Sequence, residues 1–128
     1  MVILALLLAC DHPATLTEIQ DDVFTRSCAF SSCHGGTAGG LSLEEGESYE
    51  SLVGVPAEGV DATTNPDVDV SGEIRVIAGD PENSYLIKKL RIGATGIKGS
   101  PMPDGTSGMD DEKVDRIAEW IALGALND

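Results

Sequence analysis

The stretch CAFSSCH at residues 28–34 places two cysteines, Cys28 and Cys33, ahead of a directly adjacent histidine, His34. Two thiols followed at once by an imidazole are what covalent haem attachment requires: the thiols form thioethers to the vinyl groups, and the imidazole reaches the iron. The usual spacing is C-x2-C-H, whereas four residues separate the cysteines here. The motif indicates a haem site, and the longer loop makes it less specific when taken alone.

Two other roles for these three residues stay open at this point. In an exported protein Cys28 and Cys33 can close a small disulfide, because thiols outside the cytosol are oxidised or capped. Zinc can bind both thiolates and His34, but a closed structural zinc site needs a fourth ligand. The remaining cysteine and histidine, Cys10 and His12, lie at the amino end of the chain.

Short motifs flank this stretch in a fixed order between about Val23 and Ala125. They are Val23-Phe24, Ser27-Cys28, Cys33-His34-Gly35-Gly36, Gly40-Leu41-Ser42-Leu43, Tyr49, Leu52-Val53-Gly54-Val55, Ala78-Gly79-Asp80-Pro81, Ser84-Tyr85-Leu86, Lys89-Leu90, Gly99, Met102-Pro103, Ile117, Trp120-Ile121 and Gly124-Ala125. The series resembles a bacterial family of small, often exported c-type cytochrome domains that use the C-x4-C-H variant. That resemblance implies an all-α, cytochrome c-like helical domain around one covalent haem c.

The resemblance also implies the iron ligands, with His34 proximal and Met102 distal. A thioether opposite an imidazole is a known axial pair, and it raises the reduction potential of haem iron. The alternatives are that Met102 fills a gap in the core, or that Met109 is the ligand. Met109 precedes the last expected helix at N′, with Val114 at N4, so half of a hydrophobic staple is the better interpretation.

Local signals predict four helices. A capping box at residues 15–18 begins the first, a weakly marked one is expected around 48–53, and Asp80 with Pro81 is expected to open the third. The last is expected to start at Asp110. Apolar residues at helical spacing mark the buried side of the first and last helices, which we expect to pack together near the haem: Leu16, Ile19, Val23, Phe24, Val114, Ile117, Ile121 and Ala125.

An acidic insertion is expected over about residues 44–78. Its first thirty residues, 44–73, hold nine acids and no Lys or Arg. Apolar residues alternate on both sides of Ser71-Gly72, which predicts a small β-hairpin over 68–77. The acids from Asp67 onward imitate the start of an EF-hand calcium loop, but the twelfth position lacks the bidentate Glu, so solvated acids at a hairpin turn are the better interpretation.

The amino end predicts export and a lipid anchor. Residues 1–9 read MVILALLLA, which is far shorter than the roughly 20 residues that span a bilayer and is typical of a signal peptide. The next residue completes a lipobox-like LLAC, so Cys10 is the expected lipidation site, residues 10–14 a tether and residues 15–128 the domain. A buried apolar segment with a free Cys10 is the alternative. Export places the domain in the bacterial cell envelope, facing the periplasm or the outer surface.

Composition limits the partners. With 8 Lys+Arg against 22 Asp+Glu, the net charge of −14 excludes nucleic acid, and the membrane is expected to be met only through the anchor. We expect redox proteins as partners, through transient, salt-sensitive contacts. Half of the basic residues lie close to Met102 in the sequence: Lys88, Lys89, Arg91 and Lys98. They form either a solvated helix end or a positive rim that interacts with haem propionates or with an acidic partner.

Function therefore has one leading prediction and two alternatives. One Trp, two Tyr and two Phe are few aromatic residues for the core of a 128-residue chain, which suits a domain whose centre is filled by haem. No acid–base or nucleophilic constellation accompanies the motif, so an electron carrier is expected and not an enzyme. The alternatives are a haem-based sensor with a vacant or displaceable distal site, and a haem-free structural lipoprotein with a Cys28–Cys33 disulfide.

Overall fold

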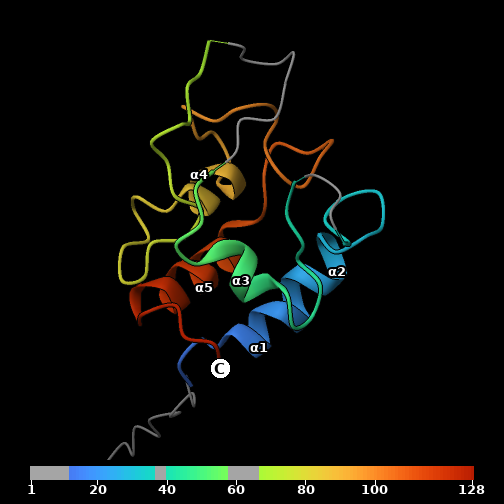
Figure 1. Ribbon diagram of the computed structural model, residues 1–128, viewed down its shortest axis with the longest axis vertical. Helices are drawn as coiled ribbons and strands as arrows, with labels where there is room; N and C mark the ends of the chain where they lie inside the picture. Colours follow the sequence, from blue (N-terminus) through green and yellow to red (C-terminus); the bar gives the residue numbers. More distant parts are fainter. Residues whose placement is uncertain (1–11, 37–39, 58–66) are drawn as a thin grey trace, which may run out of the picture.

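A computed structural model of the chain describes residues 12–36, 40–57 and 67–128. These residues are mostly helical, as the all-α prediction requires, and the extended segments among them meet at isolated bridges. In Figure 1 the amino-terminal helix lies along the base of the molecule and the carboxyl-terminal helix, α5, lies beside it, with the short helices α3 and α4 above. The apolar core lies between these helices.

The amino-terminal helix is continuous from α1 (Leu16–Ile19) through a π-helical turn, η1 (Gln20–Phe24), into α2 (Thr25–Ser27). Its predicted cap is confirmed, because Thr15 Oγ1 accepts a hydrogen bond from the Glu18 N–H at 3.2 Å. The predicted apolar stripe is buried in full. A buried glutamine in the π-turn, Gln20, donates to the Leu43 carbonyl at 2.9 Å and accepts from the Ser48 hydroxyl at 2.7 Å. This polar network joins the helix to the segment that follows residues 28–34.

The carboxyl-terminal helix α5 (Asp111–Ala122) begins where the sequence predicts. Asp110 is its N-cap, and the carboxylate accepts from the backbone N–H groups of Glu112 and Lys113 at 3.0 and 3.4 Å. Its apolar side is buried against α1 and α4, as expected for helices that share one core. The pairing of the first and last helices is therefore confirmed.

The third helix starts later than predicted. Helix α4 (Tyr85–Leu90) has Ser84 as its N-cap, and the Asp80 carboxylate is used in the preceding turn, where it accepts from Asn83 at 2.8 Å. The first N–H groups of α4 are bound instead by an extended segment, since Tyr85 donates to the Ile74 carbonyl at 2.9 Å. Asp80 therefore does not open the helix. The weakly marked helix is present as α3 (Ser48–Leu52).

The predicted β-hairpin over residues 68–77 is wrong. Its turn forms, because the Glu73 N–H donates to the Val70 carbonyl at 2.9 Å. The two arms do not pair with each other; residues 74–76 lie instead along residues 53–56, for example through the Arg75 N–H and the Val55 carbonyl at 2.8 Å. Pairing with 53–56 places Val76 in the main core, where it is fully buried. Residues 58–66 of the acidic insertion lie outside the described ranges.

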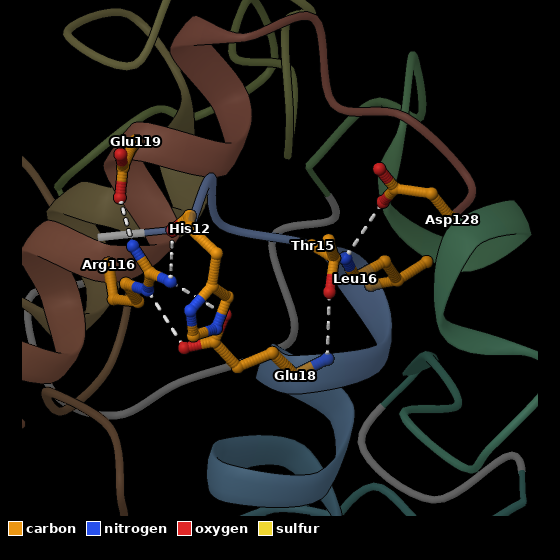
Figure 2. Close-up of polar contacts among 7 residues, drawn as sticks. All are labelled: His12, Thr15, Leu16, Glu18, Arg116, Glu119 and Asp128. Atoms are coloured by element: carbon orange, nitrogen blue, oxygen red, sulfur yellow. Dashed lines mark hydrogen bonds and ion pairs between the residues drawn. The ribbon is translucent and has the colours of Figure 1, made fainter. Parts of the chain in front are cut away.

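The residues just before α1 are tied to α5 (Figure 2). Arg116 binds both carboxylate oxygens of Glu18 at 2.8 Å and donates to the His12 carbonyl at 2.9 Å. Asp128 accepts from the first N–H of the helix, that of Leu16, at 3.0 Å. Ala14 is only 3% exposed and belongs to the core. Of the residues that the sequence assigns to the tether, Ala14 is thus buried in the core and His12 is bound through its carbonyl, whereas the side chains of His12 and Pro13 are exposed.

Acid is expected to weaken this connection, because hydrogen bonding to Arg116 holds the pKa of Glu18 below its ordinary 4.5. A carboxyl group with a depressed pKa adds stability at neutral pH, and that stability is lost as the pH falls through its folded value. From about pH 5 to about pH 3 the free energy of unfolding should fall more steeply in the parent than in Glu18→Gln. Urea unfolding measures both, and an exposed control, Asp22→Asn, should keep the parent's slope. Equal slopes in Glu18→Gln and the parent would contradict this role.

Candidate functional site

The CAFSSCH loop follows α2 directly and closes on itself. The N–H of Cys28 completes the helix by donating to the Phe24 carbonyl at 2.9 Å. Within the loop Cys33 donates to the Phe30 carbonyl at 2.9 Å, and the His34 N–H returns to the Cys28 carbonyl at 3.0 Å. The first and last residues of the motif are therefore joined by their backbones, and the longer spacing still brings Cys28 and His34 together.

Glycine after the histidine is required by this closure. The Gly35 N–H donates to the Phe30 carbonyl at 2.8 Å, and a Cβ atom at Gly35 would lie 2.9 Å from both backbone atoms of that carbonyl. Any other side chain would push the loop open. The His34 carbonyl accepts from the Leu43 N–H at 2.8 Å, and its imidazole Nδ1 is excluded from solvent. Backbone hydrogen bonds to Cys28 on one side and to Leu43 on the other thus fix the position of His34.

The two cysteines are free thiols with different surroundings. Cys28 is 9% exposed and lies in the main apolar core, whereas Cys33 is half-buried. Burial, with a smaller contribution from Cys33, raises the pKa of the Cys28 thiol to about 11. Cys28 is therefore neutral at pH 7, and its surroundings favour an uncharged sulfur. A thioether is uncharged, whereas zinc binding and disulfide formation both proceed through the thiolate.

Met102 packs against the same apolar core as Cys28. It is half-buried, and its N–H donates to the Lys89 carbonyl in α4 at 2.9 Å, which fixes the backbone that carries the sulfur. The structure therefore brings Met102 to the apolar core that contains Cys28.

Met109, the competing sulfur, is 5% exposed and immediately precedes the N-cap Asp110. It shares the core with Val114, which is fully buried. The Met109 N–H donates to the Leu90 carbonyl at 2.7 Å. These positions are those of the predicted hydrophobic staple.

The basic cluster near Met102 divides into two parts. Lys88 and Arg91 form ion pairs with acidic side chains at 2.9 and 2.8 Å, so their charges are compensated. The Lys89 ammonium donates to the Lys98 carbonyl, and burial lowers the pKa of Lys89. Of the positive rim that the sequence suggests, Lys88 and Arg91 are thus paired with acids, and the Lys89 ammonium is bound by a backbone carbonyl.

The zinc and calcium alternatives find no assembled site. Across residues 12–36, 40–57 and 67–128, no three Cys, His, Asp or Glu side chains are placed to hold a metal ion. In the segment that imitates a calcium loop, Asp69 accepts from the Ser71 N–H at 2.9 Å, which lowers its pKa. That carboxylate caps a turn.

The sequence analysis did not single out one buried charge, that of Arg75. It is 8% exposed, and its guanidinium donates to the backbone carbonyls of Ser51 at 2.8 Å and Gly40 at 3.2 Å. A signal was available, because Arg75 is the first base after the stretch 44–73 and stands between two apolar residues. A lone charge inside an apolar run indicates a buried cation, which needs partners.

A pocket of about 110 Å³ lies elsewhere, between α1, the segment before α3 and the carboxyl end. Its lining includes Gln20, Tyr49 and Asp128 and none of the residues of the haem motif. This pocket does not contribute to the site.

Comparison of the chain with protein-family models, with curated proteins and with solved structures gave no match in any of the three. No helix among the described residues is long and apolar enough to span a membrane. The predicted signal peptide, residues 1–9, and Cys10 lie outside those residues. The assignment of the site therefore rests on the chemistry of this chain's own side chains.

Proposed function

We propose that the protein is a c-type cytochrome that carries single electrons through one haem attached to Cys28 and Cys33. His34 and Met102 are the proposed proximal and distal ligands. One observation carries the proposal: Cys28 and Met102 meet the same apolar core, and the Cys28 carbonyl binds the His34 N–H at 3.0 Å. An attached macrocycle would thus be held by two thioethers, an imidazole and a thioether ligand around one apolar region.

The residues present fit the chemistry of attachment. Each thiol adds across one vinyl group, with the sulfur bonding to one carbon and the proton passing to the other, so no oxidant is needed. Cys28 and Cys33 are both free thiols, and the buried environment of Cys28 favours the neutral sulfur that results. When bound, the haem supplies an iron that alternates between Fe(III) and Fe(II), tuned by its axial ligands and by burial.

The cytochrome c-like fold is part of the same proposal. It is supported by the packing of α1 on α5 and by the place of the motif directly after the first helix. The scarcity of aromatic residues also supports it, because a haem would supply apolar area that the side chains lack. We further propose a lipid anchor at Cys10, a periplasmic or outer-surface location, and redox proteins as transient partners.

Haem staining of a denaturing gel tests the function, with the chain expressed in bacteria that possess a haem-attachment system. Haem that survives denaturation is expected on the parent. It should be reduced in Cys28→Ala and in Cys33→Ala and absent when both are replaced, because each thioether is a separate covalent bond. The matched control is Cys10→Ala, which should keep the haem. A parent that does not stain would overturn the proposal.

A further inference from the structure

Two leucines, Leu123 and Leu126, are exposed at the carboxyl end of α5. Each is more than half exposed to solvent, although each is large and apolar. Leu123 is the C-cap of α5, and a Cβ atom at Gly124 would lie 3.8 Å from Cδ2 of Leu126, so the two leucines flank one glycine. A single exposed leucine is ordinary on a protein surface, but adjacent ones indicate a surface that makes a contact. Leu123 and Leu126 are called the leucine pair below.

The amino-terminal part of the domain lies at the same end of the molecule. The Arg116 guanidinium donates to the His12 carbonyl at 2.9 Å (Figure 2). Leu123 follows Arg116 by seven residues, which is two turns of α-helix, so both lie on one side of α5, about 10 Å apart along its axis. Figure 1 shows the carboxyl end beside the start of α1. The leucine pair and the first described residue therefore share one end of the domain.

The backbone that carries Leu126 is held on both sides. Its own carbonyl accepts from the Trp120 indole N–H at 2.8 Å. Two residues later, the Asp128 carboxylate accepts from the Leu16 N–H at 3.0 Å, and the Asp128 carbonyl accepts from the Thr17 N–H at 2.9 Å. These bonds fix the exposed side chain of Leu126 beside the start of α1.

Several acids at this end are matched by donors. Glu18 and Glu119 are both paired with Arg116. The Asp128 carboxylate accepts from the first N–H of α1, where the helix dipole favours a negative charge. The chain as a whole has a net charge of −14, which repels anionic lipid headgroups. Compensation of these three acids makes this end better suited to a lipid surface than an uncompensated acidic face would be.

We propose that the leucine pair contacts the lipid surface to which Cys10 is anchored, and so orients the domain on the membrane. This inference rests on the proposed lipid anchor. Cys10 precedes His12 by two residues, so their Cα atoms are at most about 7 Å apart. A connection this short holds the end of the domain that carries the leucine pair close to the bilayer. There the leucine side chains leave water for the boundary between headgroups and acyl chains.

A protein partner fits this surface less well. A stable protein–protein interface buries about 800 Å² on each partner, which is far more than two side chains supply. The lipid surface needs no comparable area, because the covalent anchor already keeps the domain beside it. The added contact is then intramolecular in effect and only selects one orientation.

Hydroxyl-radical footprinting on phosphatidylcholine vesicles tests this orientation. In the lipidated chain, oxidation of the leucine pair should be several-fold slower than in mature Cys10→Ala, residues 10–128 without lipid, in the same suspension of vesicles. The matched control is Ile92, an apolar residue that is also more than half exposed. Its neighbour Arg91 pairs with acids in the first two turns of α5, at the opposite end of that helix, so oxidation of Ile92 should be equal in both proteins.

Mass spectrometry of the intact chain separates failure of this inference from failure of the proposed anchor. A chain with lipid on Cys10 whose leucine pair is oxidised as fast as in the lipid-free chain would overturn the orientation alone. A chain without lipid would overturn the anchor and the orientation together. Protection of the leucine pair without vesicles would also overturn the orientation. It would assign the leucine pair to a second copy if protection rises with protein concentration, or to residues 1–9 if the chain retains them.

Discussion

Replacing Met102 by leucine is expected to lower the midpoint potential on the order of tenths of a volt, because axial ligands move haem potentials over a range of about 0.8 V. A methionine sulfur opposite an imidazole favours Fe(II), so its loss should favour Fe(III). Leucine is close to methionine in volume, and such exchanges usually cost less than about 1.5 kcal/mol in stability. The half-buried position of Met102 against the core should therefore be kept. Spectroelectrochemical titration measures the potential.

The same variant should gain a ligand site. With no thioether at the distal position, reduced Met102→Leu should bind carbon monoxide tightly, whereas the parent should bind it weakly. The control is Met109→Leu, which makes the same change at the buried staple position and should keep the parent's potential and its weak carbon monoxide binding. If Met102→Leu instead behaves like the parent in both respects, Met102 is not the distal ligand, and the haem-based sensor becomes the better hypothesis.

The helices that the sequence predicts well are those whose end signals are satisfied locally. The Asp110 carboxylate accepts from N–H groups two and three residues along, and Thr15 accepts from the Glu18 N–H. Asp80 carries an equally good signal, but its carboxylate is consumed by Asn83 in a turn. The N–H groups that open α4 are bound by residues 74–75. A local sequence pattern does not indicate which carbonyls from distant residues will bind the first N–H groups of a helix.

The wrong prediction of a β-hairpin also arises from a long-range partner that the local pattern does not specify. Alternation around Ser71-Gly72 is a real local signal, and the turn it predicts is present. Alternation does not state which strand will be the partner, and residues 53–56 occupy that place. Burial of Val76 in the main core, which a hairpin isolated in a solvated loop would not give, favours the longer-range pairing.

The candidate site divides in a similar way. Cys28 and His34 belong to one short motif, which predicts haem attachment and leaves other roles open, and the fold joins these two residues through a backbone hydrogen bond. Met102 was assigned only through the resemblance, and its contact with the core comes from the fold. The burial of Arg75 is indicated by its place between two apolar residues, but its partners are not, because they are backbone carbonyls, which every residue has.

Replacing Trp120 by alanine is expected to lower the free energy of unfolding by about 3–5 kcal/mol, the usual cost of removing a large buried aromatic side chain. Trp120 is 1% exposed in the core, and its indole N–H donates to the Leu126 carbonyl at 2.8 Å. Small domains are stable by about 5–15 kcal/mol, so the loss would take much of the total. Guanidinium unfolding of the haem-loaded protein measures it.

Phenylalanine at the same position separates the two contributions of Trp120. Trp120→Phe keeps most of the apolar area but loses the bond to Leu126, and it should cost about 1–3 kcal/mol. All three proteins should still stain for haem on a denaturing gel, because thioethers to Cys28 and Cys33 do not depend on the packing of α5. Staining that falls in parallel with stability would mean that the fold, and not covalent bonds, retains the haem. An unfolding midpoint unchanged in Trp120→Ala would contradict the central place of this residue in the core.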